Sequence, residues 1–174
     1  MPFNFRHVGP HMQTTNIDTS RLQTLCENQW EGNIIPSLEE YIRIPALSPS
    51  FDSNWAENGF IDEAINHIAD WCREQPIEGL QLQILRLEGR TPLIHMFVPG
   101  QTDEVVLLYQ HADKQPEFVG WHEGLSPWEP VRRGDRLYGR GGADDGYGAY
   151  ASLTAIRAIQ EQGIPHAALH LIVE

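Results

Sequence analysis

Basic side chains are scarce in this sequence. Its 174 residues carry 12 lysines and arginines against 24 aspartates and glutamates, which gives a formal net charge of −12 at pH 7. Nucleic acids and anionic membranes are bound by basic surfaces, so this balance argues against both as partners. A surplus of carboxylates also suits a protein that holds cations, although a solvated acidic surface is the more common explanation.

Cysteine and long apolar runs are equally sparse. The two cysteines, Cys26 and Cys72, are too few for a disulfide framework and lack the spacing of a metal motif. We interpret both as buried thiols in a reducing compartment and predict a cytoplasmic protein. No window approaches the 18 apolar residues of a membrane span. The first residues also lack the apolar core of a signal peptide.

The remaining composition is that of one globular domain. Hydrophobic residues make up 41% of the chain and charged residues 21%. Residues 1–17 are predicted to be a flexible tail, in which "GPHM" resembles a cloning scar but can equally be native. Residues 18–174 are long enough to bury one core.

Helical and strand patterns alternate along residues 18–174, which predicts the α/β class. Apolar residues at helical spacing predict helices over 18–30, 36–44, 60–72 and 145–162. Strands are predicted over 80–87, 93–98, 105–109, 135–141 and 167–174. The run "EVVLLYQ" is apolar throughout, which is typical of a buried central strand.

Two short segments carry the residues with chemical potential. "YQHADKQP" places His111 at the carboxyl end of the strand 105–109, with Asp113 two residues further on. Asp144 and Asp145 lie where a glycine-rich loop enters a helix. A histidine that ligates a metal usually donates its other ring N–H to a carboxylate. His111 and Asp113 can make that contact locally, and a carboxylate from the second segment would complete one side of a zinc site.

Each feature also has a simpler explanation. His-x-Asp occurs by chance in many proteins, Asp144 or Asp145 could cap the following helix, and the glycines could merely form turns. A phosphate loop is a poor interpretation, because neither G-x-x-x-x-G-K-[ST] nor G-x-G-x-x-G is present and the two carboxylates would repel phosphate. The spacing of a calcium-binding loop is also absent.

Taken together, these segments closely resemble the zinc peptidase family M20 of clan MH. The resemblance is carried by "LLYQHADKQP", then "GW" and "PW", then "LYGRGGADDGYGAYASL". The upstream segments "YIRIPALSPSFD" and "GRTPLIHMFVPG" extend it over roughly residues 20–174. The family includes carnosinase-type dipeptidases, glutamate carboxypeptidases, aminoacylases and acetylornithine deacetylase.

The resemblance implies a fold and a site. The fold would be α/β, with a central, mostly parallel mixed sheet and flanking helices. His111 would bind one of two zinc ions, Asp113 would orient His111, and Asp144 would bridge both ions, with manganese or cobalt as substitutes. Family members commonly have a cis peptide after the bridging aspartate. The alternative is a trans bond with Asp144 or Asp145 as a helix cap.

The sequence departs from the family in two ways. Gly146 and Tyr147 follow the aspartate pair where many members have Lys-Gly. The chain also ends at Glu174, just before the expected Glu-Glu pair that supplies the general base and a zinc ligand. The further ligands and the inserted lid domain are missing too. Residues 18–174 are therefore predicted to be the N-terminal part of a truncated catalytic domain, with an uncovered, unpaired strand 167–173 that favours self-association.

The predicted parent protein is a two-zinc exopeptidase that hydrolyses dipeptides or other C-terminal peptide or amide bonds. The fragment alone is predicted to be inactive. A second possibility is an N-acyl amino acid deacylase of the same family, and a third is a catalytically dead interaction fragment. The implied partners are a peptide or N-acyl amino acid substrate and a second copy of the chain, joined through the missing lid domain.

Overall fold

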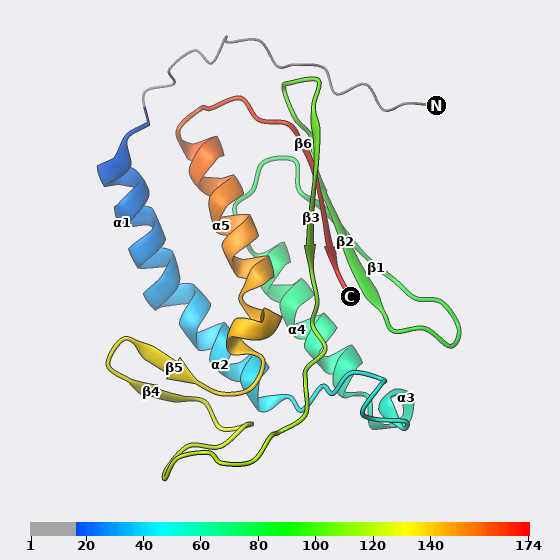
Figure 1. Cartoon of the computed structure of the whole chain (residues 1–174). Helices are drawn as coiled ribbons and strands as arrows, with labels where there is room; N and C mark the ends of the chain where they lie inside the picture. Colours follow the sequence, from blue (N-terminus) through cyan, green and yellow to red (C-terminus); the bar gives the residue numbers. More distant parts are fainter. Residues whose placement is uncertain (1–16) are drawn as a thin grey trace, which may run out of the picture.

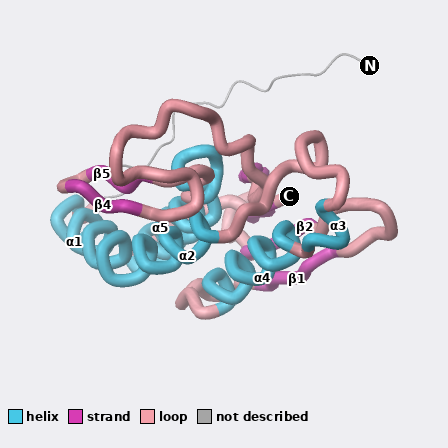
Figure 2. Tube along the Cα trace, turned by 90° about the horizontal axis from the view of Figure 1, so that it is seen from below, coloured by secondary structure: helices cyan, strands magenta, loops and turns pink. Residues whose placement is uncertain are grey.

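The computed structural model describes residues 17–174, so the tail predicted for residues 1–17 lies outside the described residues except for Ile17. A four-stranded sheet forms one side of the molecule and the helices lie on the other (Figure 1). Seen from below, the long helices lie side by side (Figure 2). No helix within residues 17–174 is long and apolar enough to cross a membrane.

The four predicted helices begin and end close to the predicted positions, and the short helix α3 (Trp55–Asn58) was not predicted. The predicted helices are α1 (Thr19–Gln29), α2 (Ile35–Arg43), α4 (Phe60–Arg73) and α5 (Gly148–Glu161), and one wider turn, Trp30–Ile34, joins α1 to α2. The Asp18 carboxylate caps α1 by accepting from Arg21 N–H. Pro36 lies in the first turn of α2, where its missing N–H costs nothing. Ile44 before Pro45 is extended and ends α2.

The strands form a mixed sheet in the order β1-β2-β6-β3. Its strands are β1 (Gln81–Leu85), β2 (Leu93–Val98), β3 (Val105–Gln110) and β6 (Ala168–Val173), and β4 (Val131–Arg133) and β5 (Arg136–Tyr138) form a separate hairpin. Only β3 and β6, which are joined through α5, are parallel, whereas β1–β2 and β2–β6 are antiparallel. The expectation of a mostly parallel sheet is therefore wrong for the described strands, because the short loop between β1 and β2 forces an antiparallel hairpin.

The predicted positions of two strands in the sheet are also corrected. β3 was expected to be central and buried, but it forms an edge, and Val105, Leu107 and Tyr109 are 66%, 60% and 58% exposed. β6 was expected to present the unpaired edge, but it is paired on both sides. An apolar run shows that both faces of a strand are apolar without showing its neighbours. Self-association of the chain stays a prediction.

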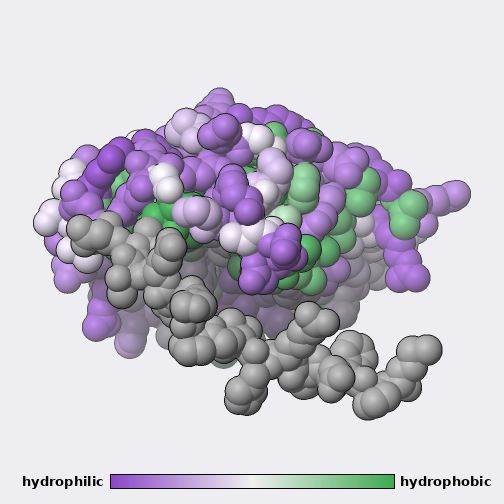
Figure 3. All heavy atoms as spheres, turned by 90° about the horizontal axis from the view of Figure 1, so that it is seen from above, coloured by the Kyte–Doolittle hydropathy of each residue, from purple (hydrophilic) through white to green (hydrophobic). Residues whose placement is uncertain are grey.

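The core lies between the helices and one face of the sheet. Along β2 and β6, alternate residues are buried: Ile94, Met96, Val98, Leu169, Leu171 and Val173. α4 contacts β1 and β2, α5 contacts β3, and α1 and α2 pack against α5 and α4. The surface seen from above is mostly hydrophilic, with hydrophobic residues emerging over the sheet (Figure 3).

The cysteines fit the prediction only in part. Both are free thiols. Cys72 is buried in α4, and burial raises the pKa of its thiol to about 12. Cys26 is exposed, which contradicts the expectation that both are buried, because it lines an open groove between α1 and α5.

Candidate metal site

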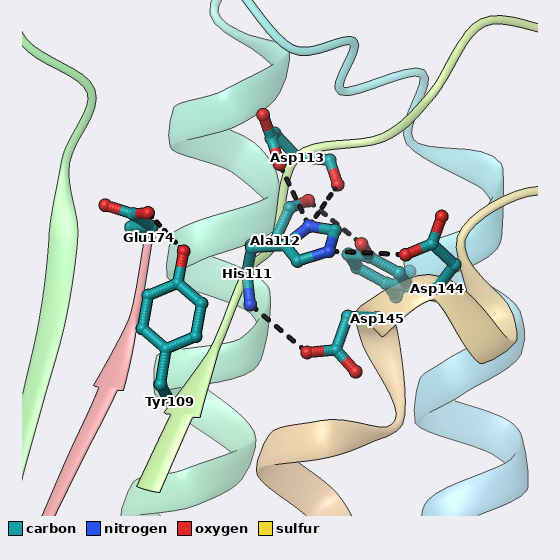
Figure 4. A network of polar contacts seen from close by, with 8 residues as sticks. Tyr109, His111, Ala112, Asp113, Asp144, Asp145 and Glu174 are labelled. Atoms are coloured by element: carbon teal, nitrogen blue, oxygen red, sulfur yellow. Dashed lines mark hydrogen bonds and ion pairs between the residues drawn. The ribbon is translucent and has the colours of Figure 1, made fainter. Parts of the chain in front are cut away.

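The predicted site residues meet where β3 ends and α5 begins (Figure 4). His111 directly follows β3, and Asp144 and Asp145 lie in the irregular turn Gly142–Gly146 that precedes α5. A Cβ on Gly148 would lie only 2.4 Å from Cγ of the buried Gln110. Glycine at the first position of α5 therefore lets the helix start pack against the last residue of β3, which brings the two segments together.

The His111 ring is held from one side and open on the other. Its Nδ1 lies 3.0 Å from both the carboxylate Oδ1 and the backbone O of Asp113. Both atoms are acceptors, so Nδ1 carries the hydrogen and donates it. This leaves Nε2 to face Asp144 Oδ1 at 3.3 Å (Figure 4). The Asp144 side chain is 61% exposed, so the space beside the two atoms opens to solvent.

The charges around His111 favour a positive group at Nε2. Burial lowers the pKa of His111, but the hydrogen bond to the Asp113 carbonyl and the charges of Asp113, Asp145 and Asp144 outweigh it, so the pKa is raised. In a neutral ring with hydrogen on Nδ1, the bare Nε2 would face a carboxylate. A proton or a metal cation between the two atoms relieves that repulsion.

The separation of His111 Nε2 and Asp144 Oδ1 fits a shared zinc ion. Two ligands of a tetrahedral zinc, with bonds of about 2.0–2.2 Å, lie roughly 3.3–3.6 Å apart. The observed 3.3 Å falls at the lower end of this range. The donor set, one imidazole and one carboxylate, is also one that zinc accepts. Within residues 17–174 no group of three or more histidines, cysteines or carboxylates could hold a metal, so these residues supply only part of a coordination shell.

Asp145 has a different place from Asp144. Its Oδ2 accepts from the backbone N–H of His111 at 3.4 Å (Figure 4). The peptide bond between Asp144 and Asp145 is cis, as the sequence predicted. The alternative, in which one of them caps α5, is wrong: the cap position is Tyr147 and makes no side-chain cap bond.

Tyr41 supports the site and was missed by sequence reasoning. Its hydroxyl donates to the backbone O of Ala112, the residue between His111 and Asp113, at 2.9 Å. Tyr41 is fully buried, and burial raises the pKa of its hydroxyl well above the ordinary value, so it stays a donor. A Cβ on Gly146 would lie 2.2 Å from the Tyr41 ring, so Tyr41 also underlies the turn that carries Asp144. The only signal for Tyr41 in the sequence was a helical spacing that also describes any core residue.

The other conspicuous residues have ordinary contacts. His67 contacts Ser37, and His166 contacts the backbone O of Ala167. Trp121 and Trp128 both donate to Glu117 within their loop. Glu174 accepts from the Tyr109 hydroxyl (Figure 4). None of these residues joins His111 and Asp144.

The segment that holds the site matches a known family. Residues 107–174, which include His111, Asp113 and Asp144, match the model described as Peptidase family M20/M25/M40. An uncharacterized metallohydrolase of Methanocaldococcus jannaschii is 26% identical over 129 residues, which are 72% of this chain and 31% of that relative.

Solved structures show the same fold. A dipeptidase of Saccharomyces cerevisiae matches with a TM-score of 0.65 at 20% identity, over 90% of this chain and 34% of its own. Human carnosine dipeptidase 1 matches with a TM-score of 0.65 at 21% identity, over 88% of this chain and 33% of its own. An M20 family metallo-carboxypeptidase of Sulfolobus solfataricus matches with a TM-score of 0.64 at 21% identity, over 82% of this chain and 30% of its own.

The chain spans about a third of the length of these relatives. The family model covers the segment with the predicted ligands, and the fold neighbours cover nearly all of the described chain. On this evidence residues 107–174 are similar to peptidase family M20/M25/M40, and the described chain has the fold of these solved structures.

Proposed function

We propose that these residues are part of a two-zinc metallo-exopeptidase that hydrolyses dipeptides or other C-terminal peptide bonds. One observation carries the proposal: His111 Nε2 and Asp144 Oδ1 face each other at 3.3 Å while Asp113 holds the opposite ring nitrogen. This is the arrangement of a ligating histidine with its supporting carboxylate. The match of residues 107–174 to a family of peptidases supports the reaction class.

The residues have separate roles in this proposal. Asp113 fixes the tautomer and direction of His111, and Tyr41 fixes the backbone between them through Ala112. His111 and Asp144 would hold zinc, which supplies a coordinated water of lowered pKa and polarises the amide carbonyl. We propose that the general base and the remaining ligands are contributed by protein outside the 174 residues, which would leave this chain inactive alone.

Zinc binding tests the site directly. Calorimetric titration of the 174-residue chain with zinc chloride should show a binding event that His111→Ala and Asp144→Asn weaken about tenfold or more. His95→Ala is the matched control, since it removes an imidazole from the sheet and should leave zinc binding unchanged. Equal zinc affinity in all four proteins would refute the assignment of His111 and Asp144.

An activity assay tests the prediction of an inactive chain. With zinc and a dipeptide, the pure 174-residue chain should give no turnover. Zinc-dependent hydrolysis that disappears in His111→Ala would contradict the proposal that the base lies outside these residues.

The choice of substrate class has weaker support. Dipeptidases and a carboxypeptidase among the similar structures favour peptides over N-acyl amino acids. Comparing dipeptides with N-acetyl amino acids as substrates of the whole protein would decide between them. A cytoplasmic location is proposed as well, supported by the two free cysteines.

A further inference from the structure

Lys114 is a buried ammonium that contacts carbonyls in place of a carboxylate. Its side chain is 1% exposed, and Nζ lies 2.6 Å from Tyr41 O, 2.6 Å from Ile44 O and 3.3 Å from Ile42 O. These carbonyls lie in the last turn of α2 and directly after it, where the helix dipole is negative. Tyr41 O and Ile44 O also accept from the backbone N–H groups of Ile44 and Ala46. The three N–H donors of the ammonium match the three acceptors.

Holding a lysine in this place is costly. Burial lowers the pKa of Lys114 to about 7. Among the described residues no aspartate or glutamate pairs with it to offset that cost. A position that only filled the core would be cheaper with an apolar side chain. The contacts around Lys114 therefore need a further explanation.

Lys114 ties the His-x-Asp segment to the chain that follows α2. Its backbone N–H donates to Ala46 O at 2.8 Å, and its backbone O accepts from Ser48 N–H at 3.0 Å. Its Nζ also lies 3.9 Å from the centre of the Tyr41 ring. Since Tyr41 in turn holds Ala112, the ammonium supports the residue that fixes the backbone between His111 and Asp113.

The stem of the same side chain supports the turn that carries Asp144. A Cβ on Gly141 would lie 2.6 Å from Lys114 Cε and 2.8 Å from Cδ, so the turn rests directly on the lysine methylenes. Gly146 N–H donates to Gly141 O at 2.8 Å and closes the turn around Asp144 and Asp145. Lys114 thus contacts both segments that supply the proposed metal ligands.

We propose that Lys114 is a positioning residue that sets the separation between His111 and Asp144. Its ammonium clamps the end of α2 beneath the His-x-Asp segment, and its stem forms the floor of the Gly141–Gly146 turn. The metal part of this inference rests on the proposed function. The alternative is a lysine that stabilises the fold as a whole without acting on the site in particular.

Two pairs of variants separate these explanations. Each is measured in the metal-free chain and in the chain titrated with zinc. Lys114→Met keeps the length of the side chain and removes the ammonium, and Met96→Ala is its control, a core truncation in β2 away from the site. Gly141→Ala lifts the turn from an intact Lys114. Gly89→Ala is its control, because Gly89 also has a positive φ, 71° against 87°, but has nothing within 4 Å of an added Cβ.

The first readout is amide hydrogen exchange in the metal-free chain, measured by NMR. Lys114→Met and Gly141→Ala should speed exchange of the Gly146 amide about tenfold or more relative to the Ala151 amide in α5. The control variants should change both amides in the same proportion. If Lys114→Met and Gly141→Ala also change the two amides in proportion, Lys114 acts on global stability only and the inference is overturned.

The second readout is zinc affinity at a temperature where every variant is folded. Lys114→Met and Gly141→Ala should lower the affinity about tenfold, and the two controls should not. If Lys114→Met does not fold, Gly141→Ala against Gly89→Ala decides alone. A wild-type chain that binds no zinc would refute the proposed function, and the exchange measurement would still decide whether Lys114 holds the turn.

Discussion

Two clusters of polar side chains in this molecule contain a histidine and are built differently. At the end of β3, His111 lies between the carboxylates of Asp113 and Asp144. On the sheet face away from the helices, His95 of β2 and His170 of β6 stack with ring centres 5.2 Å apart, and His95 Nε2 lies 2.9 Å from His170 Nδ1. The pairing of β2 with β6 brings these two histidines together.

The difference lies in what faces each ring. Between His95 and His170 one nitrogen must donate to the other, so a proton occupies the space where a cation would have to lie. The third contact, from Gln83 Nε2 to His95 Nδ1 at 3.3 Å, brings no charge. At His111 the carboxylates point one ring nitrogen at Asp113 and leave the other facing Asp144. Orientation and negative charge, more than proximity of histidines, distinguish a metal site.

Removing the charge of Asp113, which orients His111, should have the largest effect on zinc binding. In Asp113→Asn an amide replaces the carboxylate at equal size, so His111 loses the charge that fixes its tautomer. Zinc affinity should fall about 10–100-fold by calorimetry, as is typical for second partners of metal-bound histidines. Asp103→Asn makes the same chemical change at an exposed position before β3 and should leave the affinity unaltered. Similar losses in both variants would mean that net charge alone attracts the zinc.

Removing the support beneath His111 should have the next largest effect. Tyr41→Phe leaves the backbone O of buried Ala112 without its partner. The free energy of unfolding should drop by about 1–2 kcal/mol in urea denaturation. Tyr109→Phe also removes a donating hydroxyl, in this case one that donates to the Glu174 carboxylate, but Tyr109 is 58% exposed. Its loss should stay within about 0.5 kcal/mol. If Tyr41→Phe and Tyr109→Phe lower the free energy of unfolding equally, burial of the tyrosine does not determine the cost of losing its hydroxyl.

The contrast also marks how far sequence reasoning reached. The ligands were predictable because their chemistry is local: His111 and Asp113 are two residues apart, and glycines flank Asp144. Tyr41 and Lys114 were not, since their contacts with Ala112 and α2 span 71 and 73 residues. Helical spacing placed Tyr41 in the core without showing what its hydroxyl would meet.

The fold, too, was predictable where it depends on neighbouring residues and not where it depends on distant ones. Helix ends at Asp18, Pro36 and Pro45 were predictable from capping and proline rules, which act within a few residues. The order of the strands was not. The apolar run of β3 indicated a strand correctly, but its place at the edge depends on which strands pair, and that information is spread over β2, β3 and β6.

The smallest expected effect is the pH dependence of the metal-free site. The pKa of His111 is raised above its ordinary value, because hydrogen bonding to Asp113 and the nearby carboxylates outweigh burial. A histidine whose pKa is higher in the folded state stabilises the fold below its unfolded pKa, and this contribution is lost as the pH rises through the folded pKa. The unfolding free energy of wild type minus that of His111→Gln should therefore decrease from pH 5 to pH 8, with His95→Gln measured alongside as the control for loss of an imidazole. A difference that grows with pH would mean that burial outweighs the carboxylates, and Nε2 would then be neutral where the geometry calls for a positive charge.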